Sequence, residues 1–105
     1  MSTNRLEVLR SLAAQNPGDP FTRYGLAMEL SKSGQLNEAV EEFRLLLASN
    51  PDYSAGYFHG GQTLEKLGRL EEARSVYEAG IAVTSRTGDA HTRGELQAAL
   101  DLLPI

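Results

Sequence analysis

The chain has 105 residues, a formal net charge of −4, 41% hydrophobic residues and no cysteine. A chain of this length is expected to form one domain, and the missing cysteines exclude disulfides and thiolate metal sites. Acidic and basic residues are interspersed, without the basic patch of a nucleic-acid-binding protein, so we expect no nucleic-acid partner. No apolar run approaches the roughly 20 residues of a transmembrane helix, and residues 1–10 lack the pattern of a secretory signal. We therefore expect a soluble, cytoplasmic protein that does not bind membranes.

The first predicted helix occupies residues 3–16 and stops before Pro17. Its apolar stripe has helical spacing and consists of Leu6, Leu9, Leu12 and Ala13. Together with Val8, these residues place apolar groups on more than one face of the helix.

A helix pair is predicted over residues 20–53. Asp19 can cap the first helix, and Pro20 is tolerated in a first turn because its missing N–H needs no partner there. Gly34 can adopt positive φ and end that helix, and Asn50 before Pro51 ends the second. The two apolar stripes are Leu26, Ala27 and Leu30, then Leu36, Ala39, Val40, Phe43, Leu46 and Leu47.

A second pair follows over residues 54–87, with a break at Gly68. Its stripes are Tyr57, Gly60, Gly61, Leu64 and Leu67, then Leu70, Ala73, Val76, Tyr77 and Ile81. A final helix over 89–103 begins at Gly88-Asp89 and carries Leu96, Ala99, Leu100 and Leu103. Its stripe lies about two residues later than a strict repeat would place it, which predicts a longer connection from Thr84 to Asp89. The chain is thus expected to be all-α, with about six helices.

The two pairs are related by a constant shift along the sequence, from position 20 to position 54. Shifting residues 20–53 onto 54–87 gives seven identities, where chance supplies about two. Most of them fall between Leu30 and Ala39, at the corner between the two helices. A helical bundle with a coincidental period is the alternative to a true repeat.

These residues resemble the tetratricopeptide repeat family, whose motif has Trp-x2-Leu-Gly-x2-Tyr, then Ala-x3-Phe and a closing proline. The first unit has Arg23, Leu26, Ala27, Leu30, Ala39, Phe43 and Pro51, and the second has Tyr57, Gly60, Gly61, Leu64, Ala73, Tyr77 and Ser85. Arg23 departs from the aromatic position and Ser85 from the closing proline. The resemblance implies a right-handed α-solenoid of antiparallel helix pairs: a half-repeat (3–16), two repeats (20–53 and 54–87) and a capping helix (89–103). It also implies that Ala27 and Gly61 lie where the helices of a pair approach closely.

The resemblance further implies that the first helices of successive pairs line a concave groove that binds a protein or peptide. Next to the core positions, the groove face falls on Phe21, Tyr24, Met28, Ser31 and Lys32, then on Phe58, His59, Gln62, Glu65 and Lys66, with Arg93 from the final helix. Phe21, Tyr24, Met28 and Phe58 would form an apolar patch suited to docking. Alternatively, Phe21 and Phe58 are buried under neighbouring helices.

One subclass of the family binds the C-terminal carboxylate of a partner protein through lysine, asparagine and arginine side chains. The corresponding positions here hold Tyr24, Met28, His59, Asp89 and Arg93. Only Arg93 agrees, and Asp89 would repel a carboxylate. We therefore do not expect that binding mode.

Catalytic and metal-binding patterns are not found. His59 and His91 lie far apart in the sequence, outside any zinc motif, and Gly60-Gly61 lies within a helix rather than in a phosphate-binding loop. The glutamates of the second helices (Glu38, Glu41, Glu42, Glu71, Glu72 and Glu78) are expected to face solvent. We expect no cofactor, no metal and no enzymatic activity.

Two functional hypotheses remain. The first is an adaptor or scaffold that binds a peptide or helix of an unidentified partner protein in the groove. The second is a structural module that forms a weak homo-oligomer through its ends. The apolar residues at these ends are Leu6, Val8, Leu9 and Leu12 of the N-terminal helix and Leu102, Leu103 and Ile105 at the C-terminus. An accessory subunit of a larger complex is a third possibility.

Overall fold

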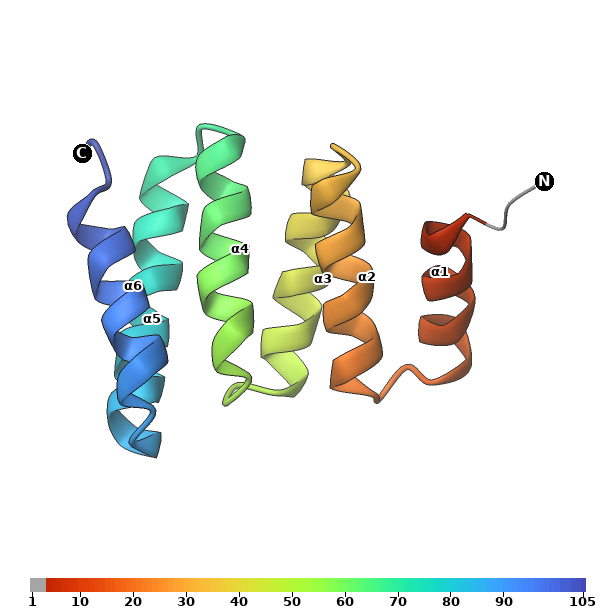
Figure 1. Cartoon of the computed structure of the whole chain (residues 1–105), viewed down its shortest axis with the longest axis horizontal. Helices are drawn as coiled ribbons and strands as arrows, with labels where there is room; N and C mark the ends of the chain where they lie inside the picture. The colour runs from red at the N-terminus through yellow and green to blue at the C-terminus, as the bar shows by residue number, and fades with distance from the viewer. Residues whose placement is uncertain (1–3) are drawn as a thin grey trace.

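The computed structural model describes residues 4–105, which form six α-helices and no strand (Figure 1). The helices are α1 (Arg5–Gln15), α2 (Pro20–Lys32), α3 (Leu36–Ser49), α4 (Ser54–Lys66), α5 (Leu70–Thr87) and α6 (Ala90–Asp101). The predicted all-α class is confirmed. The predicted start of the first helix at residue 3 lies outside the described residues. None of the described helices is both long and apolar enough to cross a membrane.

The helix ends follow the local chemistry of the sequence. The Asp19 carboxylate accepts a hydrogen bond from the backbone N–H of Phe21 (3.2 Å) and caps α2. Asp89 caps α6 in the same way through the N–H of Thr92 (3.1 Å). Gly34 and Gly68 follow α2 and α4 with φ of +83° and +75°, a conformation that residues with a side chain rarely adopt. The predicted breaks are therefore confirmed.

Successive helices run antiparallel and pack on one another along the 44 Å long axis of the molecule (Figure 1). The alternate helices α2 and α4 are also in contact, as are α4 and α6. The first helices of successive pairs therefore share one side of the molecule, which is the side that the resemblance assigns to a groove.

The predicted apolar stripes form two adjacent clusters. The first joins α1, α2 and α3 and is made of Leu6, Ala13, Leu26, Ala27, Leu30, Ala39, Phe43 and Leu46. The second joins α4, α5 and α6 and is made of Tyr57, Leu64, Ala73, Tyr77, Leu96 and Leu103. Half-buried residues of α3 and α5 (Val40, Leu47, Val76 and Ile81) pack against the second cluster. Leu12 differs from its predicted stripe, since 41% of it is exposed.

The predicted connection from Thr84 to Asp89 is wrong. Helix α5 continues through Thr87 and is 18 residues long, against 14 for α3. The reason is the residue at position 85: a proline ends α3 at the corresponding position 51, whereas Ser85 keeps its N–H and lets the helix run on. Gly88, with φ of +80°, then ends it.

The expectation that every glutamate of the second helices faces solvent is wrong for Glu42. Its carboxylate accepts a hydrogen bond from the Arg23 guanidinium of α2 (2.6 Å), and both side chains are largely buried. Arg23 replaces the family's aromatic residue, and at the corresponding position Tyr57 donates to the Pro51 carbonyl (2.6 Å). The charge of Arg23 draws Glu42 inward, because a half-buried cation needs an anionic partner.

Candidate functional site

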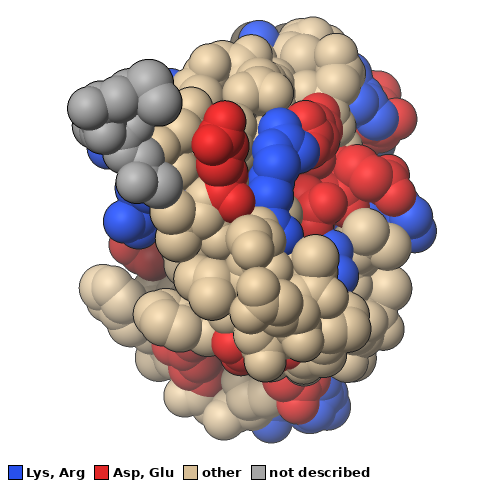
Figure 2. All heavy atoms as spheres, turned by 90° about the vertical axis from the view of Figure 1, so that its right-hand side faces the viewer, with Lys and Arg blue, Asp and Glu red and all other residues tan. Residues whose placement is uncertain are grey.

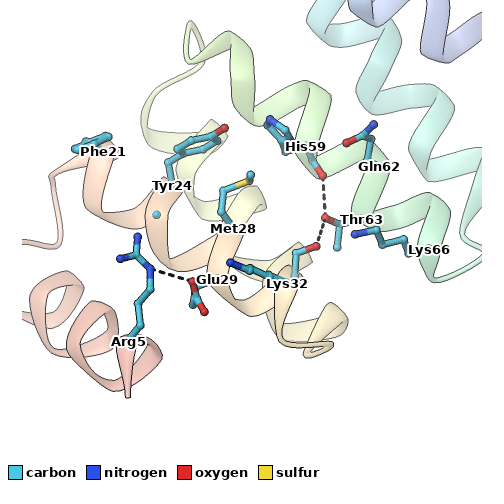
Figure 3. A pocket seen from close by; sticks show the side chains of 12 residues that line it. Arg5, Phe21, Tyr24, Met28, Glu29, Lys32, His59, Gln62, Thr63 and Lys66 are labelled. Atoms are coloured by element: carbon cyan, nitrogen blue, oxygen red, sulfur yellow. Dashed lines mark hydrogen bonds and ion pairs between the residues drawn. The ribbon is translucent and has the colours of Figure 1, made fainter. Parts of the chain in front are cut away.

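The main candidate site is a hollow between α2 and α4, of about 770 Å³, with Arg5 of α1 at its edge (Figure 3). We call it the concave groove. Eight of the predicted groove residues line it: Phe21, Tyr24, Met28, Ser31, Lys32, His59, Gln62 and Lys66. The other lining residues are Arg5, Gly25, Glu29 and Thr63.

Helical spacing explains why these side chains share one surface. Tyr24, Met28 and Lys32 follow one another at intervals of four along α2, so they stand one above the other on the same face. His59, Thr63 and Lys66 are spaced by four and three along α4. The opposite faces of both helices carry the leucines and small residues of the core, which fixes the direction in which the groove side chains point.

Aromatic rings form one end of the groove. The Tyr24 ring lies 5.9 Å from that of His59, 5.2 Å from that of Tyr53 and 6.5 Å from that of Phe43, between ring centroids. Burial raises the pKa of the Tyr24 hydroxyl, with a smaller contribution from Tyr53. Burial also lowers the pKa of His59. A neutral imidazole beside a tyrosine ring therefore offers an amphipathic surface at neutral pH.

A pair of hydroxyl groups joins the two walls of the groove. The Ser31 and Thr63 hydroxyl oxygens lie 3.1 Å apart and share a hydrogen bond, and Thr63 also donates to the His59 carbonyl (2.8 Å). Thr63 is almost fully buried. This bond holds α2 and α4 together near the lysine at the end of each helix.

The groove has a cationic end. Lys32 and Lys66 are the last residues of α2 and α4, and neither has an ion-pair partner within residues 4–105. Glu29 does have a partner, because Arg5 donates to its carboxylate (3.0 Å). The free charge in the groove is therefore positive.

Three predicted groove residues, Phe58, Glu65 and Arg93, lie outside the groove. Phe58 is half-buried, packs against the core cluster of α4–α6, and its ring centroid lies 5.2 Å from that of His59. Arg93 is exposed on α6, and the Glu65 carboxylate accepts a hydrogen bond from the Tyr77 hydroxyl. Phe21, by contrast, is 73% exposed at the mouth of the groove. Of the two phenylalanines for which burial was the alternative, only Phe58 is held by neighbouring helices.

Four lining residues were missed in the sequence. Gly25, Glu29 and Thr63 lie on the same helix faces as the predicted residues, so helical spacing could have found them. Arg5 had no such signal, because it comes from α1 and reaches the groove only through its ion pair with Glu29.

The groove can hold apolar side chains at its aromatic end and anionic groups at its lysine end. Among residues 4–105 no three histidine, aspartate or glutamate side chains are grouped to hold a metal ion. A second hollow of about 550 Å³ lies between α3 and α5, on apolar residues including Val40, Leu47 and Val76, with charges of both signs around it.

Comparison with known proteins identifies the repeat. The profile of the family described as "Tetratricopeptide repeat" matches residues 22–53 and 55–85, more than half of the chain. An uncharacterized protein of Methanocaldococcus jannaschii is 35% identical over 60 residues, which make up 57% of this chain and 70% of that protein.

Solved structures agree with this assignment. A tetratricopeptide repeat domain protein from Salinibacter ruber has a TM-score of 0.79 and 37% identity, covering 85% of this chain and 90% of its own. The protein PcrH, in complex with the chaperone binding region of PopD, has a TM-score of 0.87, covering 93% of this chain and 74% of its own. At 16% identity, that second likeness shows the fold alone. The chain belongs to the tetratricopeptide repeat family.

Proposed function

We propose that this chain is a non-catalytic, cytoplasmic protein-interaction module that binds a peptide or helix of a partner protein in the concave groove. The observation that carries the proposal is the exposed apolar end of the groove, where Phe21, Tyr24 and Met28 surround an open hollow. Exposed apolar surface beside polar groups is typical of protein interaction sites. In this proposal the repeats span 20–53 and 54–87, flanked by the half-repeat (3–16) and the capping helix (89–103) of a single domain.

The likeness to PcrH supports an interaction role, since that protein was solved with a binding region of PopD. The site residues also favour binding over catalysis. Their hydroxyl, imidazole and ammonium groups are spread along two helices, and among the described residues of the groove no nucleophile lies next to a base and an orienting group, as covalent catalysis requires.

The test is recovery of partner proteins from the native host, comparing the wild-type chain with a Phe21→Ser, Met28→Ser variant. Both substitutions shorten side chains at the groove and leave the fully buried core residues unchanged, although Met28 packs against the edge of the first cluster. We expect partners to be captured by the wild type and lost with the variant. Leu102→Ser is the matched control, because Leu102 is 82% exposed outside the groove. Equal recovery with all three proteins would exclude the groove as the binding surface, and circular dichroism would verify that each variant is folded.

Self-association through the N-terminal end is a second candidate, favoured by one comparison within the repeat. Leu12 corresponds to Leu46 one repeat later, yet Leu12 is 41% exposed and Leu46 is fully buried. In the first repeat α2 covers α3, whereas no described helix precedes α1 to cover it. Val8 on the same helix is also 42% exposed. Figure 2 views the molecule from this end and shows a wide uncharged surface next to a cluster of charged side chains.

Sedimentation equilibrium at several concentrations would test this second candidate. We expect a weak dimer that a Val8→Glu, Leu12→Glu variant turns into a monomer, whereas Leu102→Glu leaves it unchanged. A wild-type chain that stays monomeric up to about 1 mM would exclude it, since even a Kd of about 1 mM would produce detectable dimer.

A further inference from the structure

The charge of the concave groove is opposite to that of the whole chain. Its charged lining residues are Arg5, Lys32 and Lys66 against Glu29, so the groove carries +2, while the whole chain carries −4. Because Arg5 and Glu29 pair with each other, the excess belongs to the two lysines. The groove is therefore a positive surface on an otherwise acidic protein, and it attracts anionic groups that the rest of the surface repels.

The two lysines lie at the same end of the groove. They occupy corresponding positions of the two repeats, at the ends of α2 and α4. Figure 3 shows them on neighbouring helices, on either side of the Thr63 hydroxyl. The Ser31–Thr63 hydrogen bond (3.1 Å) joins their helices at this level. The positive charges of both lysines attract a carboxylate that enters this end of the groove.

The apolar end of the groove lies at a defined distance from the lysines. Tyr24 and Lys32 are eight positions apart on one helix, which corresponds to about 12 Å along its axis. In an extended peptide, which rises about 3.3–3.6 Å per residue, this distance equals three to four residues.

We propose that the ligand of the groove is an acidic segment of a partner protein, with an aliphatic or aromatic side chain three to four residues from a carboxylate. The apolar side chain packs on Tyr24 and Met28, and the carboxylate lies between Lys32 and Lys66. This inference rests on the proposed function, because it names the chemistry of the segment that the groove binds.

Four fluorescein-labelled peptides serve as probes. The first has a leucine-tryptophan pair, a three-residue glycine-serine spacer and two glutamates, and a second has the same groups in reverse order. Two further versions of the better-binding peptide replace the glutamates by glutamines, or the leucine-tryptophan pair by serines. Fluorescence anisotropy gives Kd for each at low salt and at about 0.5 M salt, where exposed charges are screened.

We expect the acidic peptide to bind about tenfold more tightly than its glutamine version at low salt, as two exposed ion pairs allow. The advantage should disappear at high salt and in a Lys32→Gln, Lys66→Gln variant. The matched control is Arg44→Gln, Arg74→Gln, which removes the same charge from α3 and α5. If both double variants lost the affinity advantage of the acidic peptide equally, only the net charge of the protein would matter, and the inference would be overturned.

The outcomes separate this inference from the proposed function. Equal binding of the glutamate and glutamine peptides, with loss only in the serine peptide, would overturn the acidic ligand and leave an apolar groove in place. Equal binding of the serine peptide and its apolar parent would contradict the apolar end of the groove. No binding of either acidic peptide at millimolar concentration would overturn the inference, while the partner-recovery experiment would still decide the proposed function independently.

Discussion

The ring of Tyr77 on α5 occupies the space that a side chain at position 61 of α4 would need. A Cβ atom added to Gly61 would lie 2.7 Å from Cδ1 of Tyr77, and closer still to its Cε1. Tyr77 is fully buried, and its hydroxyl donates a hydrogen bond to the Glu65 carboxylate. Burial, the first cause, and this hydrogen bond both raise the pKa of Tyr77. The second repeat therefore depends on one glycine to admit one large ring between its helices.

Gly61→Ala should lower the free energy of unfolding by about 2 kcal/mol, because the methyl group overpacks the contact with Tyr77. This loss outweighs the gain of about 1 kcal/mol that alanine normally brings to a helix. Gly94→Ala on α6 is the control, since nothing lies within 4 Å of the added atom, and it should raise stability. Urea denaturation measures both. If both variants changed the free energy of unfolding in the same direction, the close contact between Gly61 and Tyr77 would be contradicted.

The Arg23–Glu42 ion pair should show a coupling energy of about 1–2 kcal/mol in a double-mutant cycle to alanine. Only 20% and 16% of these side chains are exposed, and removing one partner leaves the other charge partly buried. The solvent-exposed pair Arg44–Glu41 on α3 is the comparison and should show much weaker coupling. Equal coupling in the two cycles would mean that burial adds nothing to the Arg23–Glu42 pair.

Restoring the family's proline with Ser85→Pro should destabilise the protein by about 3 kcal/mol, since proline inside a helix removes a hydrogen bond and clashes with the preceding turn. Position 85 lies inside α5. The residue before it, Thr84, is buried and donates to the Gly80 carbonyl (2.8 Å), so a change of its backbone would disturb the core. Ser85→Ala should be close to neutral. Thermal denaturation measures the difference. Equal melting temperatures for the proline variant and the wild type would contradict the prediction.

Lowering the pH should weaken the fold through His59. Burial, the largest cause, lowers its pKa below the ordinary value of 6.5, with Lys66 acting in the same direction and Glu95 and Gln62 opposing. Just below pH 6.5 the unfolded chain therefore binds more protons than the folded one, so stability increases with pH in that window and is lost as the pH falls through it. The loss should be smaller in His59→Gln. The measurement is urea unfolding at pH 5.0 and 7.5, and identical pH dependence in both proteins would exclude His59 as the cause.

Much of the fold could be predicted from local patterns. Asp19, Gly34, Gly68 and Asp89 act on the backbone within a few residues of themselves, so their effect is independent of the rest of the chain. The end of α5 was mispredicted because the late stripe of α6 indicated a longer connection. In the structure residues 84–87 of that predicted connection are helical, since Ser85 does not interrupt the helix and Gly88 supplies the break.

The groove was only partly predictable. Helical spacing places Tyr24, Met28 and Lys32 on one face, and the same rule applies to His59 and Lys66. It does not show how far neighbouring helices cover a face, which is why Phe58 proved half-buried and Phe21 exposed. The ion pair that brings Arg5 to the groove connects residues 24 positions apart, beyond any local pattern.

By itself the sequence determined the six helices, their repeat period and the small residues where helices meet, because short-range sterics and hydrogen bonds decide these features. Only the tertiary structure decided which of the predicted surface residues share a hollow, how Tyr77 fills the space beside Gly61, and which charges find partners. Those outcomes depend on the distance and angle between packed helices, which the summed contacts of many side chains set. Helical spacing was therefore enough to place Lys32 and Lys66 on the groove face. That neither has an ion-pair partner within residues 4–105, the observation on which the proposed ligand rests, could be recognised only once the helices were placed side by side.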